Sequence, residues 1–219
     1  QSDYFKNVNV SIAWYIIQNS KNKHKTNVNN LYEIDINDKL VYIPNDNNII
    51  SLSIHEKVMF KTKEKLKIEK DYVTCHNIRL KDENSILSKT KTNTHIYPIF
   101  HTNKQIWYSS IKQTHLNKKK VIWTRSGYTK PFYDNGIYGY TDLAYFILVD
   151  TDLQGENLNH NLNLKLFKYI FKTARWSGFG NDKVFYALPK LPDKKMNDIE
   201  LYNYFKLTSE EILYLTNDH

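Results

Sequence analysis

The chain has 219 residues, of which 41% are hydrophobic, 14% aromatic and 25% charged. A chain of this length can bury a sizeable core, and so high an aromatic content argues against intrinsic disorder. No run of about 18 apolar residues occurs, which excludes a membrane-spanning helix, and a single cysteine excludes a disulfide framework or a zinc site built from several cysteines. We therefore expect an intracellular protein with no membrane partner. The polar start at Gln1 shows neither a methionine nor a signal peptide, so we interpret the chain as a fragment or a processed product.

Charge is distributed unevenly along the chain. Lysine and arginine total 31 against 23 acidic residues, for a net charge of +8, and positions 111–130 hold six basic residues but no acidic one. Positions 160–195 hold eight basic and two acidic residues. Two such blocks favour a polyanionic partner, with ordinary solvated faces as the alternative interpretation. Arginine occurs only at Arg79, Arg125 and Arg175, which marks these positions as candidates for contacts that need a bidentate guanidinium.

Residues 1–70 are expected to form a strand-rich N-terminal part. The segment 8–17 is β-branched and aromatic, as in a buried strand, and 31–37 alternates apolar and polar residues like a second strand. The Asn-Asp-Asn-Asn sequence at 45–48 indicates a turn, and 54–66 has the pattern of a short helix.

Residues 71–219 are expected to form the second part of the molecule. Short strands are predicted within 71–110, and stronger ones at 120–124 and 143–149. The segment 183–189 is predicted as a further strand or an extended exit. Between them, the Asn-Gly pair in Tyr133-Asp134-Asn135-Gly136 indicates a tight turn, since this pair tolerates positive φ.

An amphipathic helix over 157–175 is the clearest helical pattern. Its apolar positions recur every four residues, at Leu158, Leu162, Leu166, Ile170 and Ala174. Its basic positions share another face, at Lys165, Lys168, Lys172 and Arg175. Further helices are predicted at 199–207 and after the capping-box sequence at 208–211. The expected fold class is α+β, with short mixed strands and this central amphipathic helix.

Known catalytic patterns are absent from the sequence. It contains no G-x-G-x-x-G or G-x-x-x-x-G-K-[ST] phosphate-binding loop, no H-E-x-x-H zinc motif and no G-x-S-x-G nucleophile elbow. The histidines are scattered, and Cys75 lies in an apolar segment typical of a buried, inert thiol. We therefore assign no catalytic residue and no metal site.

Three segments carry a family resemblance: 123–136 with its PFYDNG turn, 164–184 with LKLFKYIFK and RWSGFG, and 201–215 with LYNYFKLTSEEILYL. In order and spacing they resemble the C-terminal target-recognition region of adenine-specific DNA methyltransferases of the Type II restriction-modification kind, found in bacteria and large DNA viruses. The resemblance covers about residues 95–216. It implies a target-recognition-like domain over 71–219, a double-stranded DNA partner, and a methyltransferase catalytic domain acting in cis or in trans. Residues 1–70 could then be the end of a methyltransferase sheet.

The chain departs from that family in its catalytic motifs. The N-P-P-Y tetrapeptide that holds a flipped adenine and the F-x-G-x-G loop for S-adenosylmethionine are both missing. The resemblance therefore implies no cofactor in this chain, with S-adenosylmethionine bound by a parent catalytic domain. It also implies a location in the cytoplasm or another DNA-containing compartment.

On this interpretation, basic residues contact phosphates, and side chains near the glycines read base edges. Arg125 and Arg175 are the candidates for bidentate contacts to guanine. The full set of candidate DNA-binding residues is Lys118, Lys119, Lys120, Arg125, Ser126, Tyr128, Lys130, Lys165, Lys168, Lys172, Arg175, Trp176, Ser177, Asn181 and Lys183.

Two other interpretations remain open. The chain could be a non-catalytic protein-interaction or scaffold domain, basic because of codon bias, that binds a protein partner through its aromatic surface. Taken singly, Trp123 and Trp176 could be core residues, and the lysines could be solvated faces. It could also be a small enzyme whose site follows no known pattern. Sequence-specific DNA binding that depends on Arg125 and Arg175 distinguishes the leading hypothesis from the first of these, and a lack of S-adenosylmethionine binding would count against a cofactor site in the second.

Overall fold

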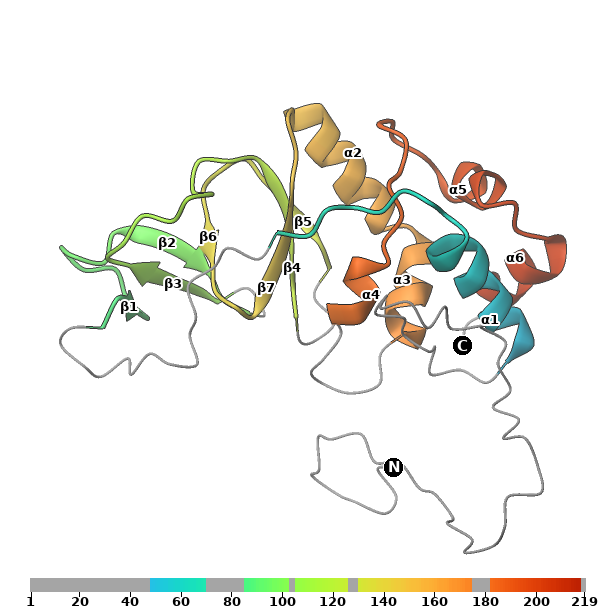
Figure 1. The fold of residues 1–219 in the computed structure, drawn as a ribbon, viewed down its shortest axis with the longest axis horizontal. Coiled ribbons are helices and arrows are strands. Elements are labelled where there is room, and N and C mark those ends of the chain that lie inside the picture. The colour runs from blue at the N-terminus through green and yellow to red at the C-terminus, as the bar shows by residue number, and fades with distance from the viewer. Residues whose placement is uncertain (1–47, 70–84, 103–104, 126–129, 175–181, 218–219) are drawn as a thin grey trace, which may run out of the picture.

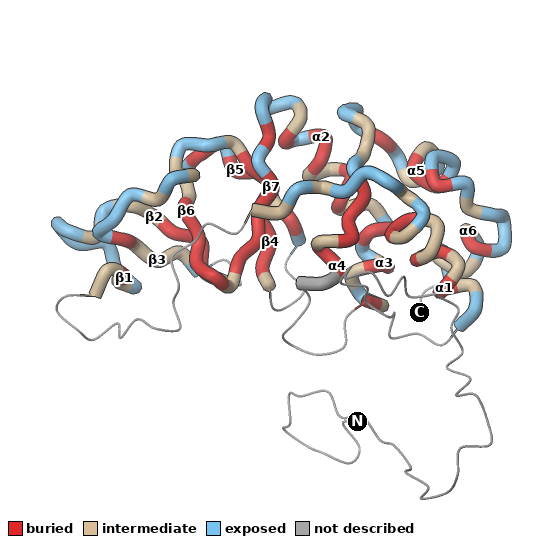
Figure 2. The backbone as a smooth tube through the Cα atoms, in the orientation of Figure 1, coloured by how far each residue is buried: buried red, intermediate tan, exposed pale blue. Residues whose placement is uncertain are grey.

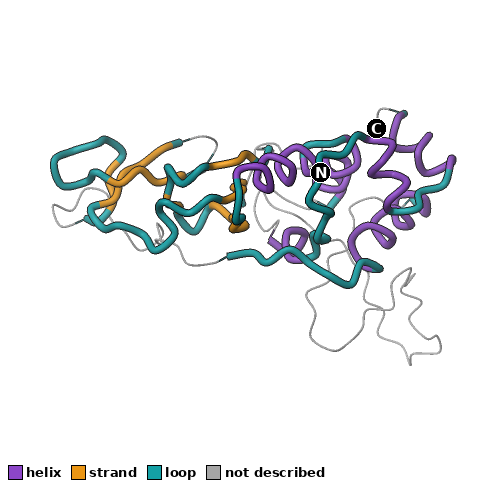
Figure 3. The backbone as a smooth tube through the Cα atoms, turned by 90° about the horizontal axis from the view of Figure 1, so that it is seen from above, coloured by secondary structure: helices purple, strands orange, loops and turns teal. Residues whose placement is uncertain are grey.

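The computed structural model describes residues 48–69, 85–102, 105–125, 130–174 and 182–217. They form an α+β fold of helices and two small sheets, which confirms the expected class (Figure 1). The strands lie toward one end of the molecule and most of the helices toward the other (Figure 3). The strands predicted at 8–17 and 31–37, and Cys75, lie outside the described residues.

The first sheet is built from short strands in the order β1-β3-β2-β6. Strands β1 (Leu87–Ser88) and β2 (Tyr97–Phe100) both pair antiparallel with β3 (Ile106–Ser109). Strand β6 (Gly139–Tyr140) pairs parallel with β2. Strands β2 and β3 bear out the short strands predicted in the later part of 71–110, while residues 71–84 lie outside the described residues.

The second sheet has the order β5-β4-β7, with β4 (Lys120–Thr124) antiparallel to both β5 (Phe132–Asp134) and β7 (Ala144–Leu148). Every residue of β4 is buried, and the strand is red along its length in Figure 2. Alternation along the strand explains this burial. Val121 and Trp123 join the core shared with the helices, while Ile122 joins a smaller cluster around Phe146.

Helices cover one side of this sheet (Figure 1). Their bounds are α1 (Ile49–His55), the π-helical turn η1 (Glu56–Phe60), α2 (Asp152–Leu162), α3 (Lys165–Thr173), α4 (Asp182–Tyr186), α5 (Asp198–Tyr204) and α6 (Ser209–Thr216). The predicted capping box before α6 is confirmed, because Thr208 and Glu211 bond each other's backbone N–H groups. Residues 48–69 contribute Ile54, Val58 and Met59 to the same core as the C-terminal helices.

The single helix predicted over 157–175 is wrong, because the chain forms two helices separated at Asn163. The Asn163 side-chain amide donates to the Pro131 carbonyl (3.1 Å) and to the Asn159 carbonyl (2.8 Å). Leu164 is extended, and the Lys165 N–H that opens α3 donates to the Asp198 carboxylate at 2.9 Å. The turn is thus held by residues that are distant in sequence, while the apolar positions on both helices stay in the core.

Two other segments differ from prediction. The apolar run 49–53 lies in α1, whose first turn is capped by Asn48, and the helix expected over 54–66 ends at Phe60. The segment 183–189, expected to be extended, forms most of α4. Only its last residue is strand-like, since Pro189 bridges to Lys65.

Candidate nucleic-acid interface

The sequence predicts that Lys120 contacts phosphate, and the structure shows that prediction to be wrong. Its ammonium group is fully buried, 2.8 Å from the carboxylate of Asp134, and it also donates to the carbonyls of Lys118 (2.8 Å) and His115 (3.1 Å). Burial lowers the pKa of Lys120, with the hydrogen bond and charge of Asp134 opposing that effect. Lys120 therefore stabilises the fold and is closed to solvent.

The partner carboxylate organises the turn predicted at 133–136. Asp134 accepts hydrogen bonds from the N–H groups of Ile137 (2.8 Å) and Tyr138 (3.2 Å), as well as the Lys120 ammonium. Gly136 has φ +109°, and a Cβ there would lie 2.9 Å from the backbone carbonyl carbon of Asn117. The motif is thus a structural turn within the described region.

Lys118 and Lys119 lie at the start of β4. Lys118 is exposed, while Lys119 forms an ion pair with Asp152 at 2.8 Å. Hydrogen bonds from Lys119 and from the Tyr133 hydroxyl hold the pKa of the Asp152 carboxyl below its usual range. Arg125 follows the other end of this five-residue strand. At a rise of about 3.3 Å per residue, Lys119 and Arg125 are about 20 Å apart, so they do not share one small patch.

The basic face predicted on the amphipathic helix is confirmed for the residues that α3 contains. Lys165, Lys168 and Lys172 are all exposed, at spacings that place them on one side of the helix. The opposite side carries the buried residues Leu166, Phe167 and Ile170. The lysine face of α3, defined as Lys165, Lys168 and Lys172, is therefore exposed to solvent.

The side chain of Arg125 lies on the side of the sheet that faces the helices. Its N–H donates to the Leu143 carbonyl (2.8 Å), which continues the β4–β7 pairing, so strand alternation places Arg125 on the same side as Trp123. The Trp123 side chain is 2% exposed and lies 4.9 Å, centroid to centroid, from Phe185. Phe185 also lies 5.7 Å from Phe171 in the last turn of α3. Trp123 is therefore a core residue that packs, through Phe185, against the last turn of α3.

The remaining candidates divide into two groups. Lys130 is exposed and immediately precedes the Pro131–β5 segment. Lys183 lies in α4, with its side chain outside the described part, and the following lie wholly outside it: Ser126, Tyr128, Arg175, Trp176, Ser177 and Asn181.

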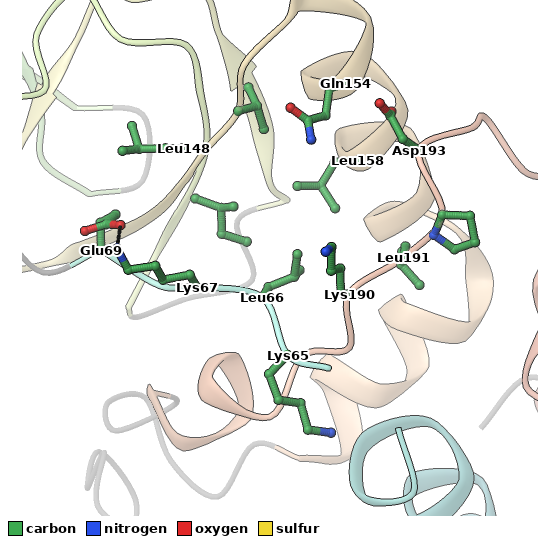
Figure 4. Close-up of a pocket in the computed structure, with 13 residues that line it drawn as sticks. Lys65, Leu66, Lys67, Glu69, Leu148, Gln154, Leu158, Lys190, Leu191 and Asp193 are labelled. Atoms are coloured by element: carbon green, nitrogen blue, oxygen red, sulfur yellow. Dashed lines mark ion pairs between the residues drawn. The ribbon is translucent and has the colours of Figure 1, made fainter. Parts of the chain in front are cut away.

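A groove beside β7 was not anticipated from the sequence. It has a volume of about 640 Å³ and is lined by residues of the 65–69 segment, β7, α2 and the 190–193 segment (Figure 4). No sequence signal identifies it, because its walls come from four separate parts of the chain. Within the described residues, no group of three or more histidine, cysteine or acidic side chains is placed to hold a metal ion.

Comparison with known proteins gives the chain no family. No family model matches its sequence, and no curated protein matches it significantly. None of the described helices is both long and apolar enough to cross a membrane. The resemblance to methyltransferase target-recognition regions therefore stays a prediction.

Proposed function

We propose that this chain is the DNA-binding, sequence-recognition module of an adenine-specific DNA methyltransferase of the restriction-modification kind. It presents duplex DNA so that a catalytic part outside this chain can flip and methylate an adenine. The observation that carries the proposal is the packing at Phe185, where Phe171 in the last turn of α3 and Trp123, two residues before Arg125 on β4, contact the same ring.

The dimensions of the lysine face suit a DNA backbone. Lys165 and Lys172 are separated by about 10 Å along the helix axis, at a rise of about 1.5 Å per residue. One strand of B-DNA carries a phosphate about every 3.4 Å along its axis. Three lysines over this span can neutralise phosphates of one strand without bending it.

Arg125 supplies the sequence-reading element of the proposal. It is half-buried, so its side chain is partly ordered by the protein, and no carboxylate among the described residues forms an ion pair with it. A guanidinium group can donate two hydrogen bonds to guanine O6 and N7 in the major groove, which discriminates against other bases by about 1–3 kcal/mol. Lys130 is a further phosphate contact in this arrangement.

The proposed contact set is smaller than the sequence suggested. Lys120 is removed because it is buried against Asp134, and Lys118 and Lys119 lie at the far end of β4 from Arg125. Long duplexes can reach both ends. Among the described side chains, the recognition surface consists of the lysine face, Arg125 and Lys130, and the candidates whose side chains lie outside the described part stay predictions.

Salt-dependent binding to labelled duplex DNA, followed by fluorescence anisotropy, tests this assignment. Replacing all three lysines of the face by glutamine should weaken binding and reduce the salt slope by roughly 0.9 for each phosphate that the variant no longer neutralises. The matched control replaces three exposed lysines elsewhere, Lys89, Lys91 and Lys195, by glutamine. Equal weakening in the two triple variants would show that only net charge matters and would exclude the proposed surface.

A further inference from the structure

The groove beside β7 lies where two strands separate. Glu69 donates its N–H to the Phe146 carbonyl (3.0 Å) and so pairs with the outer edge of β7. Three residues earlier, the Leu66 N–H instead donates to the Leu188 carbonyl (2.9 Å). The 65–69 segment therefore diverges from β7, and the groove of about 640 Å³ opens between them (Figure 4).

The pairing pattern leaves a free backbone edge in this groove. The Val149 N–H donates to the Lys119 carbonyl (3.0 Å), and the Arg125 N–H donates to the Leu143 carbonyl (2.8 Å). These two bonds fix which residue pairs of β4 and β7 are hydrogen-bonded to each other. Bonded and non-bonded pairs alternate in an antiparallel ladder, so Leu148, opposite Lys120, directs its N–H and C=O away from β4. Among the described residues beyond β4, none forms a backbone hydrogen bond with Leu148, which is 36% exposed.

The side chains around the groove combine apolar walls with one cation that points into it. Leu66, Leu158 and Leu191 face the groove in Figure 4, where the Lys190 ammonium also points into it. Among the described residues, Lys190 has an ion pair only with Glu64, at 3.3 Å, and both side chains are highly exposed (64% and 74%), so this pair is weak.

The other charged groups at the groove are directed to partners of their own, and Lys67, although 86% exposed, turns toward Glu69 (Figure 4). Lys67 pairs with Glu69 at 3.1 Å, Asp193 accepts from the Asn157 amide at 3.2 Å, and the Lys65 ammonium donates to the Met59 carbonyl. A ligand carboxylate would therefore find Lys190 as its counter-ion.

We propose that this groove binds an extended peptide of a partner protein, which adds as a strand to β7 at Leu148. The peptide's main chain bonds the free N–H and C=O of Leu148, an apolar side chain packs on Leu66 and Leu158, and an acidic side chain pairs with Lys190. This division between backbone bonds and alternating side-chain pockets is the usual mode of strand addition. Exposed strand edges are otherwise protected, and here Glu69 covers β7 only at Phe146.

The proposal is independent of DNA binding. Leu148 pairs with Lys120 and Arg125 bonds Leu143, so the groove lies at the opposite end of β7 from Arg125. A peptide and a DNA duplex could therefore occupy the chain together.

The first test uses the unmodified full chain. A peptide of alternating valine and glutamate, with uncharged acetyl and amide ends, is titrated into the protein, and hydrogen exchange of the protein's backbone amides is followed by NMR. Binding should slow exchange of the Leu148 amide at least tenfold, and a valine–lysine peptide of equal length should bind at least tenfold more weakly. An unchanged Leu148 exchange rate at saturating peptide overturns the proposal, as does an amide already protected without peptide, whether by residues 1–47 or by a second copy of the chain.

Substitutions provide the second test. Leu148→Pro removes the outward N–H, which β4 does not use, and proline is tolerated on an outer strand edge. It should weaken peptide binding about tenfold relative to Leu148→Ala, which keeps the N–H. Lys190→Gln should weaken the valine–glutamate peptide but leave the valine–lysine peptide unchanged. Equal affinity of the Leu148→Pro and Leu148→Ala variants contradicts strand addition.

Discussion

The ammonium group of Lys120 lies 2.8 Å from the carboxylate of Asp134, and neither side chain is exposed by more than 1%. Asp134 also binds the backbone of the turn that follows it, and Lys120 binds two carbonyls of the loop that precedes it. The pair therefore joins the 115–120 loop to the 134–138 turn across β4 and β5. Removing one member leaves the other charged or polar group buried without compensation.

Lys120→Met is expected to destabilise the protein by about 3–5 kcal/mol, the usual cost of breaking a buried ion pair. Lys119→Met is the matched control, because its pair with Asp152 is exposed and should contribute about 1 kcal/mol or less. Urea unfolding followed by circular dichroism measures both values. A smaller loss of stability for Lys120→Met than for Lys119→Met contradicts a structural role for the buried pair.

Gly136→Ala should destabilise the protein by about 1–3 kcal/mol, since φ is +109° and the new Cβ meets the Asn117 backbone at 2.9 Å. Lys206, which follows α5, is the control in the opposite direction, because it is a non-glycine residue with a positive φ of 55°. Lys206→Gly relieves a left-handed conformation that costs L-residues about 1–2 kcal/mol, so it should not destabilise. Thermal unfolding of both variants checks the contrast, which fails if alanine is tolerated at 136.

Asp198→Ala should weaken the start of α3. Its carboxylate accepts the N–H of Lys165, and loss of such a cap costs about 0.5–2 kcal/mol. Hydrogen exchange should accelerate in the first turn of α3, and Asp198→Asn, which keeps an acceptor, should restore much of the protection. If exchange in the first turn of α3 is unchanged in Asp198→Ala, the hydrogen bond from the Lys165 N–H to Asp198 does not stabilise the start of this helix.

Glu211 should make stability depend on pH in the acid range. Burial opposes its ionisation, but hydrogen bonds from Lys57, Ser53 and the Thr208 N–H outweigh burial and lower its pKa below the ordinary 4.5. A depressed folded pKa adds stability that is present above pH 4.5 and lost as pH falls through the folded value. Glu211→Gln should therefore flatten the acid limb of a stability-versus-pH curve. An identical acid limb in wild type and variant contradicts this assignment.

Arg125→Lys separates base reading from charge in the proposed function. Lysine keeps the positive charge but cannot form the planar, bidentate contact. Preference for the recognised duplex should fall by about 1–3 kcal/mol, while the salt slope stays unchanged because the phosphate contacts of α3 remain. Competition binding with cognate and scrambled duplexes measures the preference. An unchanged preference in Arg125→Lys would contradict base reading by Arg125, and it is the result expected if Arg125 contacts a phosphate, because lysine keeps the charge.

Elements with a local signal could be read from the sequence alone. Strand β4, the α6 capping box and the shared face of Lys165, Lys168 and Lys172 all follow from spacing along a single segment. The turn at Gly136 follows in the same way, because its φ requirement is met by the residues of the turn itself. In each case the signal and the structure lie within a few residues, so the covalent geometry of the chain determines the outcome.

Only the tertiary structure decided which of the predicted basic residues are exposed to a ligand. Lys118, Lys119 and Lys120 are identical neighbours, and only pairing of β4 with β5 places Asp134 against the third of them. Likewise, α2 ends at Asn163 because the side-chain amide of Asn163 donates to the carbonyls of Pro131 and Asn159. The groove at Leu148 exists because the 65–69 segment leaves β7, so that the Leu66 N–H bonds the Leu188 carbonyl instead. Periodicity acts through fixed distances along the chain, whereas burial and charge pairing depend on segments that meet only once the chain has folded.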